Sequence, residues 1–180
     1  MTAKSHLNTT LAIGFIPLFI FKNELIGLID YVAVYMIGLT IGALFPDIDE
    51  SKSSIGRKIP LISSFINKTV GHRNLTHNLF LYIPFLIYAY YMGVKTYNLE
   101  YILLIGFCFG SILHILEDCL TNSGVSNAMK PLLSNFVILG NKYRFNTNEK
   151  FENYVFYPIV SLILIVEVDL FTHFMLFSQR

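Results

Sequence analysis

Five apolar runs occupy most of the 180-residue chain, and they constrain its fold more than any other feature. A helix needs roughly 20 mostly apolar residues to cross a bilayer, where no water can satisfy a broken backbone hydrogen bond. Hydrophobic residues make up 54% of the chain, which is typical of a membrane protein. We therefore predict an all-α integral membrane helical bundle with about five spans, at Leu7–Phe21, Leu25–Phe45, Leu79–Val94, Leu99–Leu116 and Tyr154–Phe177.

The chain has no internal repeat or low-complexity linker, so we expect residues 1–180 to form a single membrane domain. The first and third runs are short, and we expect them to tilt or to lie in a locally thinned bilayer. A cleaved signal peptide is the alternative for the first run, but no small-residue cleavage pattern follows it. Cys108 and Cys119 lie too far apart along the fourth run to bridge each other, and we interpret them as packing thiols.

The positive charges are distributed unequally between the two sides of such a bundle. Five spans alternate sides, so the N-terminus and the two long connections share one side. Only Lys22, Lys95 and Arg180 fall on the opposite side. The positive-inside rule places the basic side in the cytoplasm of a multi-pass cell-membrane protein. The basic residues on that side are Lys4, Lys52, Arg57, Lys58, Lys68, Arg73, Lys130, Lys142, Arg144 and Lys150.

The same topology collects residues with metal-binding side chains on the cytoplasmic side. They come from four separate places in the sequence, at or just inside the ends of the first four spans. Of the five histidines, His173 alone falls elsewhere, and we interpret it as structural or interfacial. The residues that the topology gathers are His6, Asp47, Asp49, His72, His77, His114 and Asp118.

The segment "HILED" ends the fourth span and places His114 and Asp118 four residues apart, on one face of a helix. An imidazole nitrogen and a carboxylate oxygen at this spacing can reach one metal ion. Ionisable groups close to hydrocarbon are costly and are retained for function or in pairs. The alternative is a hydrogen-bonded pair that locks two helices together. Glu117 is predicted to point to another face, toward solvent or lipid head groups.

The segment "FPDIDE" follows the second span, where Pro46 is expected to end the helix. Asp47 and Asp49 can then flank a cation from a turn. Oxygen ligands of this kind suit Mg, Mn or a mixed Zn/Fe site. The alternative is a helix stop followed by a solvated acidic turn.

The segment "GHRNLTH" precedes the third span. We expect a helix capped by Asn74 or Thr76, with His77 in its first turn, where the helix dipole favours an anion such as phosphate. Arg73 carries a guanidinium fork suited to the same phosphate. The alternative is a capped helix start with interfacial polar residues, which leaves His72, His77 and Arg73 unexplained.

Together these segments supply up to seven nitrogen and oxygen ligands and no thiolate. This donor set favours two or more divalent metal ions, with one carboxylate bridging them, over a closed structural zinc site. We expect zinc, with manganese, iron and magnesium as alternatives. Two such ions can activate water at neutral pH and can hold both oxygens that change partners in a phosphoester.

Four motifs in order resemble the YdjM-like family of membrane-bound, metal-dependent hydrolases. They are an N-terminal histidine (His6), "GALFPDID", "GHRNLTHNL", and "GSILHILEDCLTNSGV" followed by Pro131. The resemblance implies a metal site with all seven ligands named above and with Arg73, Thr76 and Thr121 as supporting residues. The ligand types are more distantly similar to the zinc-dependent phospholipase C and P1 nuclease group, which suggests phosphoester hydrolysis.

We therefore predict a membrane-bound hydrolase that cleaves a phosphoester in a lipid or lipid-linked substrate. Arg73 is expected to steady the developing charge on the phosphate. Asp49 or Asp118 is expected to serve as general base. Membrane lipid is the expected partner, and no nucleic acid partner is expected.

Two alternatives belong to other functional classes. The first is a membrane metal-binding or transport protein, in which the same residues load an ion into a pathway. Asp30, Glu167 and Asp169 lie within the predicted spans and support this reading. The second is a non-catalytic partner that docks a cytoplasmic protein on the basic loops, which leaves the histidines unexplained.

Overall fold

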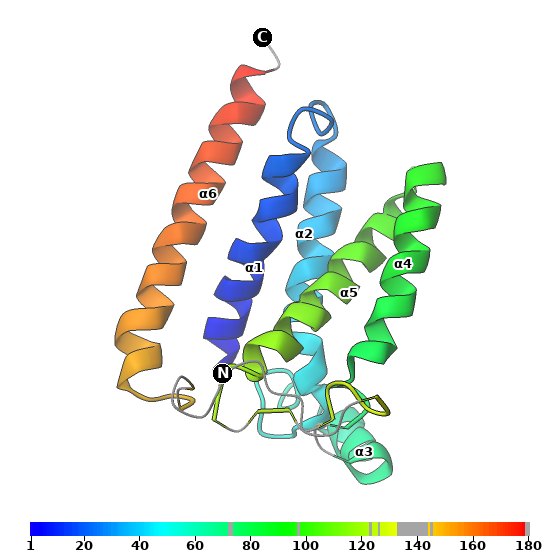
Figure 1. Cartoon of the computed structure of the whole chain (residues 1–180), viewed down its shortest axis with the longest axis vertical. Helices are drawn as coiled ribbons and strands as arrows, with labels where there is room; N and C mark the ends of the chain where they lie inside the picture. The colour runs from blue at the N-terminus through cyan, green and yellow to red at the C-terminus, as the bar shows by residue number, and fades with distance from the viewer. Residues whose placement is uncertain are drawn as a thin grey trace.

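A computed structural model of the chain confirms the all-α prediction (Figure 1). It describes residues 1–71, 74–96, 98–122, 124–125, 127–132, 144 and 146–178. Within these residues the chain forms six α-helices, of which five run side by side and the third lies apart at one end (Figure 1). Their bounds are α1 (Ala3–Ile20), α2 (Ile29–Leu44), α3 (Pro60–Val70), α4 (Leu79–Thr96), α5 (Leu99–Asp118) and α6 (Tyr157–Phe177).

Among the residues that the structure describes, three helical segments are long and apolar enough to cross a membrane: Ile29–Asp49, Leu99–Asp118 and Glu152–Phe177. The first continues α2 through the 3₁₀ helix η1 (Phe45–Asp49), and the last begins with the π-helical turn η3 (Glu152–Phe156). The apolar part of α4, Leu79–Gly93, is shorter. Each of the five predicted runs therefore forms a helix, and three of these meet the requirements for a membrane span.

The first helix begins before the first predicted span. The side chain of Thr2 accepts a hydrogen bond from the Ser5 amide and caps α1, which starts at Ala3. Glu152 fixes this end further, because one carboxylate oxygen accepts from the Thr2 amide at 2.7 Å and the other from the Asn148 amide at 2.6 Å. As a result His6 lies inside α1 rather than ahead of it.

Glycines on α2 and α5 allow these two helices to pack backbone against backbone. A Cβ at Gly42 would lie 2.1 Å from the Phe107 carbonyl oxygen, and one at Gly106 would lie 2.3 Å from the Tyr35 carbonyl oxygen. The sequence spacing is G-x-x-x-G on both helices, with Gly38 and Gly110 as the other members. Because α2 and α5 both run toward the end where the N-terminus lies, their C-terminal ends meet there (Figure 1).

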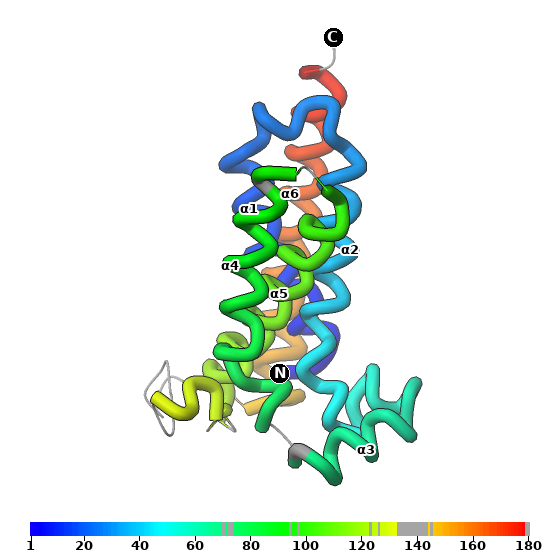
Figure 2. The backbone as a smooth tube through the Cα atoms, turned by 90° about the vertical axis from the view of Figure 1, so that its right-hand side faces the viewer, coloured from blue at the N-terminus to red at the C-terminus, as the bar shows by residue number. Residues whose placement is uncertain are grey.

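The amphipathic helix α3 was not predicted, since its segment was assigned to a connection between two spans. Pro60 begins it, and Gly71, with a φ of 83°, ends it. Figure 2 shows α3 projecting from the bundle beneath the end of α2. Its outer face exposes Leu61 (85%) and Phe65 (67%).

A cavity of about 490 Å³ lies at the opposite end of the bundle, near the α1–α2 connection. Apolar side chains from α1, α2, α4 and α5 line most of it, among them Leu18, Val32, Leu86 and Ile105. Glu24 also reaches its wall. This apolar cavity is therefore remote from Asp47, His77 and Asp118.

Candidate metal centre

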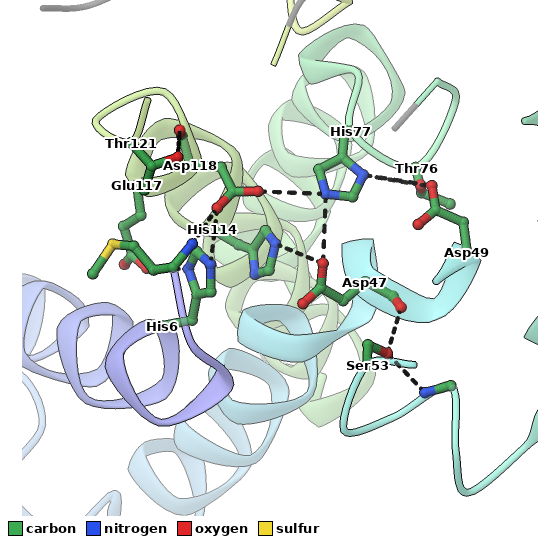
Figure 3. A network of polar contacts seen from close by, with 12 residues as sticks. His6, Asp47, Asp49, Ser53, Thr76, His77, His114, Glu117, Asp118 and Thr121 are labelled. Atoms are coloured by element: carbon green, nitrogen blue, oxygen red, sulfur yellow. Dashed lines mark hydrogen bonds and ion pairs between the residues drawn. The ribbon is translucent and has the colours of Figure 1, made fainter. Parts of the chain in front are cut away.

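The end of the bundle near the N-terminus collects polar side chains from four parts of the chain (Figure 3). His6 comes from the first turns of α1, Asp47 from η1, and His77 from the turn before α4, while the last turns of α5 supply two more. His6, His77, His114 and Asp118 are at most 1% exposed. The gathering of these residues at one end of the bundle follows from the antiparallel order of the helices.

Two overlapping groups of side chains in the described part of the chain could hold a metal ion. In each group the ligand atoms all lie within 4.8 Å of one another. The first group is His6, His114 and Asp118, and the second is Asp47, His77 and His114. All of these ligands are nitrogen or carboxylate oxygen, the donors that divalent zinc, manganese and iron accept.

His114 is held in the tautomer that a metal ligand needs. Its Nδ1 lies 2.7 Å from the carbonyl oxygen of Ala43 on α2. A carbonyl oxygen only accepts, so Nδ1 carries the proton and the neutral ring leaves its lone pair on Nε2. That Nε2 is buried without a hydrogen-bond partner among the described residues, and it lies 3.7 Å from Asp47 Oδ1. A ligand-ready nitrogen therefore faces a carboxylate across a gap too long for a hydrogen bond.

His77 is held in the same tautomer as His114, through hydrogen bonds that link its Nδ1 to Thr76 and Thr76 to Asp49. The Thr76 hydroxyl donates to Asp49 Oδ2 at 2.7 Å, and its oxygen lies 3.2 Å from His77 Nδ1. Because the hydroxyl proton is committed to Asp49, the Thr76 oxygen accepts from Nδ1. The lone pair of His77 is therefore on Nε2, which lies 3.8 Å from both Asp47 Oδ1 and Asp118 Oδ2.

Asp49 lies behind His77 rather than among the two metal-binding groups. Its Oδ2 is 3.7 Å from Nδ1, on the side of the ring away from Asp47. The side chain is fully buried. This is the position of an outer residue that orients a metal-ligating histidine. The metal-ligand and general-base roles predicted for Asp49 therefore stay predictions, and the geometry favours an orienting role.

His6 has an orienting carboxylate of its own, contributed by Glu117. His6 Nδ1 lies 2.6 Å from Glu117 Oε2, and the Thr10 hydroxyl donates to Glu117 Oε1 at 2.9 Å. The prediction that Glu117 faces solvent or head groups is wrong, since this residue is 2% exposed. Glu117 is three residues from His114 and therefore shares its side of α5, which faces α1.

Asp118 connects the two metal-binding groups. Its Oδ1 lies 3.1 Å from His6 Nε2, while its Oδ2 faces His77 Nε2 (Figure 3). The rings of His6 and His114 stack beside it with centroids 3.9 Å apart. Asp118 Oδ1 also accepts from the Met1 ammonium group at 2.7 Å. One buried carboxylate thus faces both groups and attracts positive charge.

The cluster reaches solvent through Asp47, whose side chain is 24% exposed. A second cavity, of about 500 Å³, adjoins it and contacts both Asp47 and Asp118. Its other walls come from the start of α1, the connection after η1, and Asn148. We refer to it as the polar cavity. It gives water-soluble groups a route to the two carboxylates.

The remaining predicted residues lie elsewhere or outside the described part of the chain. His72 and Arg73 are not among the described residues, so the roles predicted for them stay predictions. The Thr121 hydroxyl donates to the Asp118 carbonyl oxygen at 2.8 Å and so caps the end of α5. His173 is 62% exposed and pairs with Asp169 on α6. This confirms the prediction that His173 lies outside the cluster.

The start of α4 also differs from the prediction. Asn78 Oδ1 accepts from the Phe80 amide at 2.9 Å, so Asn78 caps this helix. Neither Asn74 nor Thr76 has that role. His77 therefore lies in the turn before the helix, where its ring can reach Asp47 and Asp118.

The fold and the cluster together define an α-helical membrane protein with a buried histidine–carboxylate site that fits a divalent metal ion. The chain belongs to the family of YdjM inner membrane proteins, because the sequence model of that family matches residues 1–176. This result confirms the resemblance found in the sequence motifs.

Individual relatives match a shorter part of the chain. The uncharacterized protein YvsG of Bacillus subtilis is 36% identical over 86 residues, which are 47% of this chain and 50% of that protein. The inner membrane protein YdjM of Escherichia coli is 37% identical over 82 residues, which are 46% of this chain and 42% of that protein. The match therefore spans half or less of each relative. No solved structure matches the chain.

Proposed function

We propose that this protein is a membrane-bound, metal-dependent hydrolase of a phosphoester in a lipid or lipid-linked substrate. One observation carries the proposal. Three buried imidazoles are each bonded at Nδ1 to a different acceptor, and their Nε2 atoms face the carboxylates of Asp47 and Asp118. A purely structural cluster has no need to hold the Nε2 lone pairs of His77 and His114 toward Asp47, with His6 Nε2 against Asp118 beside them.

His114, His77 and Asp47 would hold one divalent ion, and His6 with Asp118 would hold a second, with Asp118 bridging the two. We expect zinc, because imidazole and carboxylate ligands without thiolate suit it, with manganese, iron and magnesium as alternatives. Bound ions of this kind activate water at neutral pH and neutralise charge on a phosphoester. Glu117, and Asp49 acting through Thr76, keep the rings of His6 and His77 in the ligating tautomer.

The proton of the attacking water would pass to a carboxylate that reaches the polar cavity. Asp47 and Asp118 both line this cavity, and of the two Asp47 is the more exposed, at 24% against 1%. We therefore assign the general-base role to Asp47, with Asp118 as the alternative. Arg73 is proposed to neutralise charge on the phosphate.

A lipid substrate accounts for the location of the site at the end of apolar helices. We propose that all five long helices cross the membrane and that the site lies on the cytoplasmic side, where the connections carry most of the Lys and Arg residues. The exposed face of α3, with Leu61 and Phe65, lies at the same end of the bundle and suits the head-group region of that leaflet. A lipid head group could reach the polar cavity there while its chains stay in the bilayer.

The transport alternative needs acidic side chains that line an internal path. Asp169 is instead 69% exposed and pairs with His173 on the outer face of α6. Asp30 at the start of α2 is also exposed. These two acids give no support to a carrier, whereas Glu167 on α6 is half-buried, its Oε2 has no hydrogen-bond partner among the described residues, and it keeps the carrier as the second candidate.

Phosphate release from phospholipids and lipid phosphates, measured with detergent-purified and metal-loaded protein, tests the proposal. We expect activity in the wild type and its loss in His77→Ala and Asp118→Ala, with membrane insertion unchanged. His173→Ala is the matched histidine control, because this residue is exposed and remote from the site. Turnover retained by both site variants would remove the proposal.

A further inference from the structure

The connection that follows Asp49 is tightly folded onto the site rather than extended into solvent. The Ser53 hydroxyl donates to the Asp47 carbonyl oxygen at 2.8 Å, and the Gly56 amide donates to the Ser53 oxygen at 2.9 Å (Figure 3). Asn67 on α3 donates to the Asp49 carbonyl oxygen at 2.8 Å and holds the other end. The backbone at Asp47 is thus joined by hydrogen bonds to the turn that runs up to Arg57, whose amide donates to the Ser53 carbonyl oxygen at 3.1 Å.

Gly56 makes this compact fold achievable. A Cβ at this position would lie 2.1 Å from the Glu50 carbonyl oxygen, so no larger residue fits while the turn keeps its shape. The Ser53 amide closes the turn with a bond of 2.9 Å to the same Glu50 carbonyl. The turn places the two cationic residues at its ends, Lys52 and Arg57, along the wall of the polar cavity.

Lys52 and Arg57 are the cationic side chains that line that cavity within the described part of the chain. Both side chains are exposed, and both line the same 500 Å³ cavity that Asp47 and Asp118 line. Neither side chain makes a hydrogen bond or ion pair with any residue that the structure describes. Their charges are therefore available to a ligand in the cavity, where Ser53 and Ser54 add hydroxyl groups.

We propose that Lys52 and Arg57 form a phosphate-binding wall beside the metal centre and select substrates with a doubly charged phosphate, as in a phosphomonoester or a pyrophosphate. This inference rests on the proposed function and specifies its substrate class. An anion that enters the cavity meets the carboxylates of Asp47, Glu50 and Asp118, and the two cationic side chains that line the same cavity offset part of that repulsion. Arginine offers a bidentate fork and lysine a point charge to such an anion.

The test measures binding of inorganic phosphate to detergent-purified, metal-loaded protein by calorimetry, at low and at high salt. We expect the double variant Lys52→Gln/Arg57→Gln to bind phosphate at least about tenfold more weakly than wild type, since charged hydrogen bonds are lost. Its metal content should equal that of wild type. The control Lys58→Gln/Lys68→Gln removes the same charge from neighbouring exposed positions that do not line the cavity, and we expect less than about a twofold change, because these charges are solvated and screened.

Three results would overturn the inference: no phosphate binding by wild type, equal losses in the double variant and its control, or loss of metal from the double variant. Each is separate from the hydrolase proposal, which depends on turnover and on the His77→Ala and Asp118→Ala variants. Competition by phosphatidic acid in micelles and by glycerol phosphate then identifies the source of the phosphate. Stronger competition by the lipid indicates a head group, and equal competition indicates a soluble ester.

Discussion

The two ends of the bundle hold cavities of nearly equal volume, about 490 and 500 Å³, with opposite linings. The cavity near the α1–α2 connection is surrounded by leucine, valine, isoleucine and aromatic side chains. The polar cavity at the other end is bounded by Asp47, Asp118, Lys52 and Arg57. Helices α1, α2, α4 and α5 line the apolar cavity at one end, and the histidines and carboxylates of the cluster lie at or next to their other ends. The two cavities therefore differ because the residues at the two ends of the same helices differ.

This comparison shows how hydrogen bonds can stabilise a buried cluster of ionisable side chains in a small membrane protein. Each buried imidazole of the cluster is hydrogen-bonded at Nδ1, and the orienting carboxylates of Glu117 and Asp49 each accept from a threonine hydroxyl. Burying unpaired charge near hydrocarbon is costly, and such groups are retained mainly for function. The apolar end carries no comparable network among the described residues, and its packing alone maintains it.

The largest expected effect comes from separating the helices that join the two ends. Gly42→Ala would place a Cβ 2.1 Å from the Phe107 carbonyl oxygen. We expect it to lower the free energy of unfolding in detergent by about 1–3 kcal/mol, because the backbones must move apart. Metal content should fall as well, since α2 carries both the Ala43 carbonyl and the segment leading to Asp47.

Gly93→Ala is the matched control for this substitution. A Cβ there would lie 3.4 Å from its nearest neighbour, Tyr101 Cβ, which is an ordinary contact. We expect a change within about 0.5 kcal/mol. Equal unfolding free energies for the two alanine variants would show that α2 and α5 do not depend on close backbone packing.

Replacing one glutamate by glutamine at each end of the bundle should affect metal binding at only one end. Glu117→Gln removes the charge that orients His6, and loss of such an outer partner lowers metal affinity by about 10- to 100-fold. Glu24→Gln makes the same change at the apolar cavity, and we expect no change in affinity. Titration of metal with a competing chelator measures both. A weaker affinity in both variants would mean that the effect is one of net charge rather than of the His6 contact.

The smallest expected effect concerns the surface of α3. The chain has no tryptophan, so Phe65→Trp introduces a single fluorophore on the exposed face of this helix. We expect brominated lipids in reconstituted vesicles to quench it, because this face would lie among the head groups. Ser54→Trp, at the wall of the polar cavity, should be quenched by iodide instead. Iodide quenching at both positions would place α3 in water.

Hydropathy and topology sufficed to predict the five long helices and the meeting of His6, Asp47, His77, His114 and Asp118. Alternation of spans across a membrane decides on which side each residue falls, without any knowledge of packing. The spacing of His114 and Asp118 also placed both on one face of α5. These features follow from the order of the spans and from the helical spacing of residues, and both can be read from the sequence.

The orientation of each helix about its axis is what the sequence left open. Glu117 lies beside His6 because α5 turns that side toward α1, yet the i, i+3, i+4 spacing of His114, Glu117 and Asp118 was a readable signal. The glycine spacing on α2 and α5 was another. Helix α3 was missed because a short amphipathic helix has no long apolar run. The position of Asp49 behind Thr76 depends on a turn geometry that no periodicity predicts.

Elemental mass spectrometry of detergent-purified protein shows whether this cluster holds metal ions. The wild type should carry about two equivalents of zinc, manganese or iron, and both His77→Ala and Asp118→Ala should lose them, while His173→Ala keeps them. Absence of metal from the wild type, even after reconstitution with each of these ions, would show that the cluster is a structural network and not a metal site.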